Sequence, residues 1–172
     1  MSASTSSSVP VVLVDTCVIS GVARRDMKPE DAAAFLRMAD MVQRSELTMW
    51  ASTVAREEID RIPPQFRADH IREYDALRKI RASNATWIDS DPGSPTAGEI
   101  VQHPAYRIAR RILRDENDAR LVFQAKAGGV TDFVTVDYNS VLNKAAELRD
   151  QLGIRAVSPS QYLSTGSTGF AA

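Results

Sequence analysis

The sequence holds a single cysteine, Cys17, among its 172 residues. An intrachain disulfide is therefore impossible, and nothing in the cysteine usage points to an oxidising compartment. No stretch approaches the roughly 18 consecutive apolar residues that a membrane-spanning helix needs. The first eight residues, MSASTSSS, also lack the basic start and the apolar stretch of a signal peptide. We therefore expect a cytoplasmic protein with no membrane partner, beginning with a disordered arm over residues 1–8.

The chain also lacks a charge excess and the glycine-rich motifs of nucleotide-binding proteins. Its formal net charge is -1 and 44% of its residues are hydrophobic, which argues against a generally basic nucleic-acid-binding surface and predicts one well-packed domain. No G-x-G-x-x-G or G-x-x-x-x-G-K sequence follows an apolar run, so dinucleotide and P-loop functions are unsupported. Contact with nucleic acid would have to be local.

What the chain does contain is an alternation of short apolar runs and helical patterns. The β-branched run VPVVLVD suits a central strand covered on both faces. Further strands are predicted at LTMWAS, ATWID, DFVTVD and IRAVSP, and helices over 29–44, 53–62, 65–82, 105–127 and 139–152. This alternation predicts a three-layer α/β/α sandwich with a central parallel sheet and Rossmann-like topology. We expect one domain over residues 9–163 and a flexible tail over 164–172.

Two of the apolar runs end in an aspartate, Asp15 after VVLV and Asp137 after DFVTV. The carboxyl ends of parallel strands meet at one edge of a sheet, where such folds bind ligands. We therefore expect the two carboxylates to lie near each other. An aspartate after a strand is also a common helix cap or turn former, and this simpler role stays open for both.

Two helical acids are predicted to face the same edge. Glu58 takes an apolar position on the inward stripe of its helix, whereas Glu57 is spaced to pair with Arg61 on the solvent side. Asp118 shares the apolar face of its helix near the start, where the helix dipole also favours an anion. Two carboxylates about 4 Å apart repel by on the order of 4 kcal/mol, so such a cluster predicts a cation. Ligands that are all oxygens favour Mg²⁺ or Mn²⁺.

At these residues the chain resembles the PIN-domain nucleases, a family that includes the toxins of many bacterial toxin–antitoxin pairs. VVLVDTCVI is similar to the family's first strand and STVAREEID to its second motif. NDARLVFQAKAGGVTDFVTVD is similar to its Asp-led helix, glycine-rich turn and strand ending Thr-x-Asp. The matching residues are Asp15, Thr16, Glu58, Asp118, Thr135 and Asp137. Asp115, one turn before Asp118, makes the third acid ambiguous, and the segment 63–104 is longer and more polar than the family pattern requires.

The resemblance implies a Mg²⁺- or Mn²⁺-dependent endoribonuclease that hydrolyses RNA phosphodiester bonds. Its catalytic residues and metal ligands would be Asp15, Glu58, Asp118 and Asp137. Thr16 and Thr135, with Asp115 and Asn139 as further candidates, would orient the carboxylates or a metal-bound water. For Asn139 we favour a helix cap instead. The resemblance also implies a toxin role with an antitoxin protein as partner, and a homodimer is a further expectation.

Positive charge for the substrate is predicted on one helix. Arg107, Arg110, Arg111 and Arg114 recur at helical spacing and would form a stripe for an RNA backbone that leads to Asp118. An ordinary solvated helix face explains the same spacing.

Two other functions compete with this interpretation. The same fold could be a non-catalytic RNA-binding or protein-interaction module, although all four acidic positions are filled, which favours an enzyme. A haloacid-dehalogenase-type phosphatase needs a second acid two residues after Asp15, where this chain has Cys17. Cys17 itself is expected to be a small buried thiol rather than a nucleophile.

Overall fold

The computed structural model describes residues 9–81 and 102–166. The arm expected over residues 1–8 lies outside the described residues, as do the predicted strand ATWID, the loop after it and the chain from residue 167. Helix α9, Pro159–Gly166, continues through the first residues of the stretch expected to be a flexible tail. Within the described ranges, each helix is too short or too polar to span a bilayer.

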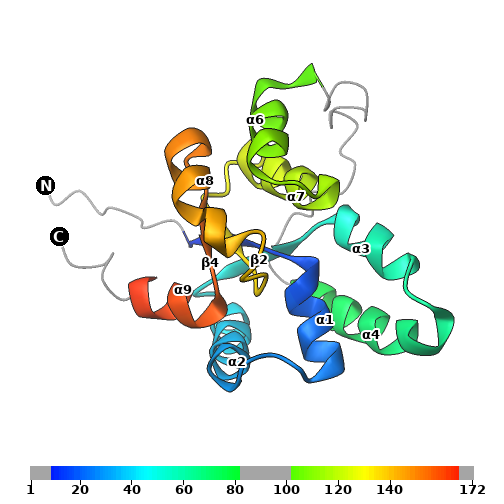
Figure 1. Ribbon diagram of the computed structural model, residues 1–172. Helices are drawn as coiled ribbons and strands as arrows, with labels where there is room; N and C mark the ends of the chain where they lie inside the picture. The colour runs from blue at the N-terminus through cyan, green and yellow to red at the C-terminus, as the bar shows by residue number, and fades with distance from the viewer. Residues whose placement is uncertain (1–8, 82–101, 167–172) are drawn as a thin grey trace, which may run out of the picture.

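The described sheet is wholly parallel, with the strand order β2-β1-β3-β4 (Figure 1). Its strands are β1 Val11–Val14, β2 Thr48–Ala51, β3 Asp132–Val134 and β4 Arg155–Val157. Val14 pairs with Ala51 on one side and with Val134 on the other, so β1 is central, as predicted. The carboxyl ends of β2, β1 and β3 therefore lie side by side.

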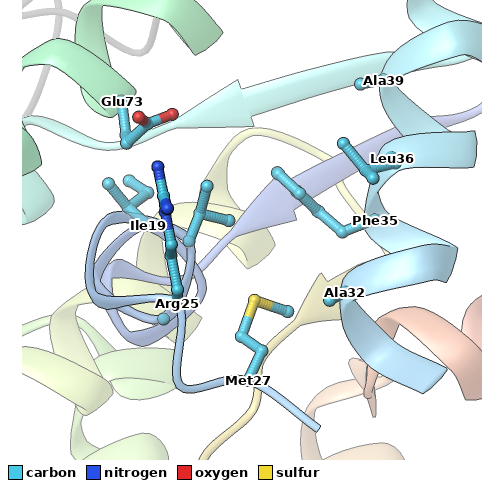
Figure 2. A pocket seen from close by; sticks show the side chains of 10 residues that line it. Ile19, Arg25, Met27, Ala32, Phe35, Leu36, Ala39 and Glu73 are labelled. Carbon is cyan, nitrogen blue, oxygen red and sulfur yellow. The ribbon is translucent and has the colours of Figure 1, made fainter. Parts of the chain in front are cut away.

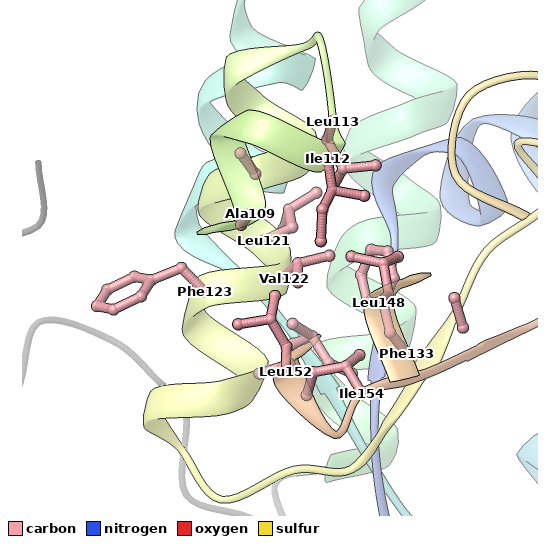
Figure 3. Close-up of a cluster of buried hydrophobic side chains, with 14 of the residues drawn as sticks. Ala109, Ile112, Leu113, Leu121, Val122, Phe123, Phe133, Leu148, Leu152 and Ile154 are labelled. Carbon is pink, nitrogen blue, oxygen red and sulfur yellow. The ribbon is translucent and has the colours of Figure 1, made fainter. Parts of the chain in front are cut away.

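Helices cover both faces of this sheet (Figure 1). Besides α9 they are α1 Thr16–Arg24, α2 Pro29–Gln43, α3 Thr53–Asp60, α4 Pro64–Arg81, α6 Pro104–Ile112, α7 Glu116–Ala127, the 3-10 turn η1 Leu142–Lys144 and α8 Ala145–Leu152. Leu13 of β1 packs into a core with α6, α7 and α8, whereas Val12 and Val14 pack into a second core with α1, α2 and α9. Figure 3 shows the first core, in which Val122 of α7 lies near Leu148 of α8. The predicted three-layer α/β/α sandwich is confirmed.

The single helix expected over 105–127 is instead two helices. α6 ends at Ile112, Leu113 is extended, and α7 begins at Glu116. The Asp115 carboxylate caps α7 by accepting from the backbone N–H groups of Asn117 at 2.8 Å and Asp118 at 3.1 Å. The apolar spacing continues across the break because Ile112 and Leu113 are both buried in the same core as α7. The sequence pattern therefore predicted one continuous helix.

Candidate functional site

The carboxyl ends of β1 and β3 bring Asp15 and Thr135 together. Val14 pairs with Val134, so the next residue on each strand stands at the same level. Thr135 is fully buried and its hydroxyl donates to Asp15 Oδ2 at 2.6 Å. Asp137, which the sequence pattern placed at the strand end, lies three residues beyond Val134, in the loop. The residue that stands beside Asp15 is therefore Thr135.

Asp15 is almost completely buried and also forms the N-cap of α1, so the simpler role left open for it is correct as well. Burial raises the pKa of Asp15, hydrogen bonds from Cys17 and Thr135 counter part of the rise, and the Asp137 charge adds to it. A raised pKa marks a carboxylate whose charge is poorly compensated in the bare protein. A cation beside Asp15 would supply that compensation.

Cys17 joins Asp15 to the neighbouring strand, a contact that sequence reasoning missed. Its sulfur lies 3.0 Å from Asp15 Oδ2 and 3.1 Å from the Thr135 hydroxyl, and it accepts from the Val136 N–H at 3.3 Å. Burial, followed by the Asp15 charge, raises the pKa of the thiol far above its ordinary value. Cys17 is therefore a protonated hydrogen-bond donor, as expected for a non-nucleophilic thiol.

Glu58 is half-buried on α3 and is held from two sides. The Thr16 hydroxyl donates to its Oε2, and Asn117 Nδ2 donates to its Oε1 at 3.0 Å. Burial raises the pKa of Glu58, the Asp15 and Asp115 charges raise it further, and these two hydrogen bonds oppose the rise. Thr16 was predicted for this role. Asn117 was not, and the signal that could have found it is its position in the first turn of α7, directly before Asp118.

Asp118 lies in the same turn, and its pKa is also raised. Burial raises the pKa of Asp118 to about 7, and the charges of Asp15, Asp115, Asp137 and Glu58 contribute in that order. The charges of the three other predicted acids therefore all reach Asp118 at this edge of the sheet. Asp115 is exposed and serves as the cap of α7, which removes the ambiguity over the third acid.

Asp137 is turned toward its own loop. It accepts from the N–H groups of Asn139 at 3.0 Å and Ser140 at 2.9 Å, and also from the Ser140 hydroxyl. Burial pushes the pKa of Asp137 upward, but these bonds outweigh burial and hold it below its ordinary value. Asp137 thus forms a turn, the simpler role left open for it. The favoured role for Asn139 is wrong, because the helix expected from residue 139 begins only at η1, which Val141 precedes as the capping residue.

The four acids do not form a preassembled ligand set. In the part of the chain that the structure describes, no three His, Cys, Asp or Glu side chains converge as a metal site would require. Carboxylates at close range repel one another, and Asp137 accepts hydrogen bonds from its own loop instead. The donor chemistry nevertheless suits a hard ion, because Asp15, Glu58 and Asp118 offer carboxylate oxygens. The Asp15 charge raises the pKa of both Glu58 and Asp118, so these carboxylates lie close enough to interact.

The arginine stripe is only partly present. Arg110 folds back onto the carbonyls of Leu113 at 3.1 Å and Arg114 at 2.6 Å, and Arg114 itself lies beyond the end of α6. Arg107 and Arg111 remain exposed beside one open hollow, where Arg111 also contacts Gln151 at 2.5 Å. The predicted continuous stripe to Asp118 is therefore wrong. A shorter pair of exposed guanidinium groups remains.

The pairing expected between Glu57 and Arg61 is also wrong. Glu57 instead forms an ion pair with Arg120 of α7, at 2.9 Å. The partner belongs to another helix because α3 packs against α7, a contact that spacing along one helix cannot predict. Glu57 faces solvent, as expected, so it offers a comparison for the half-buried Glu58 next to it.

An apolar pocket of about 330 Å³ opens between α1, α2 and α4 (Figure 2). Met27, Phe35 and the exposed Leu36 supply much of its lining, and Arg25 and Glu73 are the charged residues beside it. None of the four predicted acids lines this pocket. It is separate from the acidic edge of the sheet.

The fold and this edge define a parallel α/β/α protein with interacting acids at the carboxyl ends of its strands. No protein family's sequence profile matches the chain, and no curated protein matches it. A solved domain of a functionally unknown protein from Methanocaldococcus jannaschii is similar to it, with 18% identity, a TM-score of 0.49, and coverage of 87% of this chain and 90% of that chain. The candidate function therefore rests on the site itself.

Proposed function

We propose that the protein is a divalent-metal-dependent endoribonuclease of the PIN-domain type, which hydrolyses RNA phosphodiester bonds with Mg²⁺ or Mn²⁺. The observation that carries the proposal is that, besides burial, the charges of Asp15, Asp137 and Glu58 raise the pKa of Asp118, so that acids from four different segments meet at one place. The hydrogen bonds from Thr16 and Asn117 to Glu58 tie three of those segments together. A divalent cation would offset the repulsion among these carboxylates.

In this reaction the bound metal would polarise the phosphoryl group and lower the pKa of a bound water. Asp15, Glu58 and Asp118 would hold the ion or ions, with Asp137 completing the set from its loop. Thr135 orients the Asp15 carboxylate, and Thr16 with Asn117 orients that of Glu58. Such outer hydrogen bonds fix a ligand's direction before the ion arrives. No protein nucleophile is required, because water attacks the phosphorus.

The substrate would be held by exposed arginines. Arg107 and Arg111 of α6 lie beside the same open hollow. Both are suited to bind phosphate, because one guanidinium group can donate two parallel hydrogen bonds to two phosphate oxygens. Arg110 is occupied by backbone carbonyls at the end of its own helix. We therefore assign RNA backbone contact to Arg107 and Arg111.

Cleavage of an RNA panel by the full chain, with Mn²⁺, Mg²⁺ or EDTA, tests the proposal. Asp15→Asn and Asp118→Asn should abolish metal-dependent cleavage and keep the circular dichroism of the wild type. Glu58→Gln should lose activity as well, whereas Glu57→Gln, an exposed acid one residue away on the same helix, should keep it. Cleavage that survives Asp118→Asn, or that persists in EDTA, would contradict the proposal. Binding of RNA without any cleavage would favour the non-catalytic module.

We extend the proposal to a cytoplasmic toxin with an antitoxin partner, on the ground of the family resemblance. Expression should then arrest growth, a neighbouring gene product should relieve the arrest, and Asp118→Asn should be harmless. Harmless expression of the active wild type would count against the toxin role and leave the ribonuclease intact. The expected homodimer can be measured by light scattering of the purified chain.

A further inference from the structure

A carboxylate that the proposed reaction does not use is completely buried beneath the loop that carries Asp137. Asp31, in the first turn of α2, is 0% exposed. Its Oδ2 accepts from the Tyr138 hydroxyl, and its Oδ1 accepts from the Ser160 hydroxyl at 2.6 Å and the Ser160 N–H at 3.1 Å. Three segments that are distant in sequence therefore meet on one side chain.

The surroundings explain why Asp31 stays ionised although it is buried. It lies in the first turn of α2, and Ser160 is in the first turn of α9, so the N-terminal ends of two helices face the carboxylate. Burial pushes the pKa of Asp31 upward, but the hydrogen bonds from Ser160 and Tyr138 hold it below its ordinary value. Burial and the bond to Asp31 raise the pKa of Tyr138 to about 12. Tyr138 is therefore a dependable hydroxyl donor to a charged acceptor.

Tyr138 is the residue directly after Asp137. Its ring is also covered by the Lys28 ammonium group at 3.5 Å from the ring centroid, a cation–π contact from the residue that precedes α2. The bonds that Asp137 makes with Asn139 and Ser140 are local to the loop. They shape the turn. On its strand side the turn is tied to Asp15, because the Asp137 N–H donates to the Thr135 hydroxyl at 3.0 Å and that hydroxyl donates to Asp15. On the far side of Asp137, the contacts of Tyr138 hold the loop to α2, which belongs to the packed sandwich.

We infer that Asp31 and Tyr138 are positioning residues, which act together through the backbone of Tyr138 to hold the Asp137 carboxylate at the acidic edge of the sheet. This inference rests on the proposed metal site. It assigns to α2 and α9, which contribute none of the four acids, a part in setting the geometry of the site. The inference also distinguishes the two residues that donate to Asp31. Tyr138 is bonded to Asp137 along the chain and should affect the metal site, whereas Ser160 lies on α9 and should affect stability alone.

That difference supplies a matched pair of variants in the full chain. Tyr138→Phe and Ser160→Ala each remove one hydroxyl donor from Asp31 and leave the rest of the side chain in place. We expect Tyr138→Phe to weaken Mn²⁺ binding on the order of 10-fold, as other losses of outer support for metal ligands do, and to recover cleavage at saturating Mn²⁺. Ser160→Ala should bind Mn²⁺ as the wild type does. Its melting temperature should nevertheless fall by about as much as that of Tyr138→Phe, because each variant loses one hydrogen bond to Asp31. Electron paramagnetic resonance of free Mn²⁺ measures the binding without any substrate.

Wild-type Mn²⁺ affinity in Tyr138→Phe would overturn the inference alone and leave the ribonuclease proposal standing. Equal weakening in both variants would also overturn it, because the effect would then come from general loosening of the fold. A wild-type chain that binds no Mn²⁺ would overturn the proposed function together with this inference. Asp31→Asn, which keeps the shape of the side chain and removes its charge, should reproduce the Tyr138→Phe result.

Discussion

Thr135 and Asp15 stand 120 residues apart in the sequence, and yet the hydroxyl of one donates to the carboxylate of the other at 2.6 Å. Both side chains are buried. The bond exists because β1 and β3 are parallel neighbours in register at Val14 and Val134. The orientation of a predicted metal ligand thus depends directly on correct pairing of two strands.

Replacing Thr135 by valine keeps the shape of the side chain and removes the donor. Loss of a hydrogen bond to a buried carboxylate should lower the unfolding free energy by about 1–3 kcal/mol, measured by urea denaturation. Thr131→Val is the matched control, since Thr131 is an exposed residue at the other end of β3. It should change stability by less than about 0.5 kcal/mol. Equal effects at both positions would refute a special role for Thr135.

Two substitutions at Asp115 separate its capping role from its charge. Asp115→Ala should cost about 1 kcal/mol of stability through the lost cap of α7, whereas Asp115→Ser keeps a capping oxygen and should cost little. Because the Asp115 charge helps to raise the pKa of Asp118, both variants should lower that pKa to a similar extent. Urea denaturation and NMR titration of the Asp118 carboxyl group measure the two effects. If the alanine and serine variants were equally stable, the assignment of the cap would be wrong.

Stability without metal should fall as the pH rises. The pKa of Asp118 is raised from 3.8 to about 7, so between these values the folded state binds its proton more tightly than the unfolded state does. The unfolding free energy therefore decreases over this window and is lowest above it. The melting temperature in EDTA should show this decline, Asp118→Asn should flatten it, and the exposed Asp150→Asn should leave it unchanged. A slope that Asp118→Asn does not alter would contradict the assignment.

Metal binding should follow the opposite trend with pH. Mn²⁺ must displace the proton from Asp118, so its apparent affinity should weaken as the pH falls below about 7. Added Mn²⁺ should raise the melting temperature most at the alkaline end of the range. Calorimetric titration at several pH values measures this dependence. An affinity that is independent of pH would show that Asp118 is not a ligand.

Two asparagines near the site should behave differently when each is replaced by alanine. Asn117 donates its side-chain amide to Glu58, so Asn117→Ala should weaken Mn²⁺ binding by about 10-fold. Asn139 contributes its backbone N–H to Asp137, which alanine retains, so Asn139→Ala should bind Mn²⁺ normally. Competition with a fluorescent chelator would measure both. A larger effect at Asn139 than at Asn117 would reverse our assignment of the two residues.

Local patterns were sufficient to predict the four strands that the structure describes, the layers and the inward-facing acids. The run that contains β1 is rich in β-branched residues because both faces of the strand are buried, which makes it recognisable without any partner. Glu58 was found because an acid on an apolar stripe is unusual. Asp118 was found in the same way, and its half-buried position agrees with that interpretation.

Contacts between distant segments were not accessible to such patterns. The bond from Asn117 to Glu58 spans 59 positions and that from Tyr138 to Asp31 spans 107. In the sequence, Asp31 is an ordinary acid in the first turn of a helix, where the dipole alone would explain it. The break before α7 was missed for a different reason, because one capping side chain, Asp115, interrupts an apolar periodicity that continues on both sides.

The central position of β1 also sets when the acidic edge can first form during synthesis. A ribosome makes β1 before β3, and Thr135 follows Asp15 by 120 residues, which takes about 6 to 24 seconds at the usual ~5–20 residues per second. Throughout that interval the growing chain carries Asp15 without the strand that orients it. In a nascent chain the Asp15 carboxylate therefore gains its hydrogen bond from Thr135 only after β3 has emerged and paired with β1.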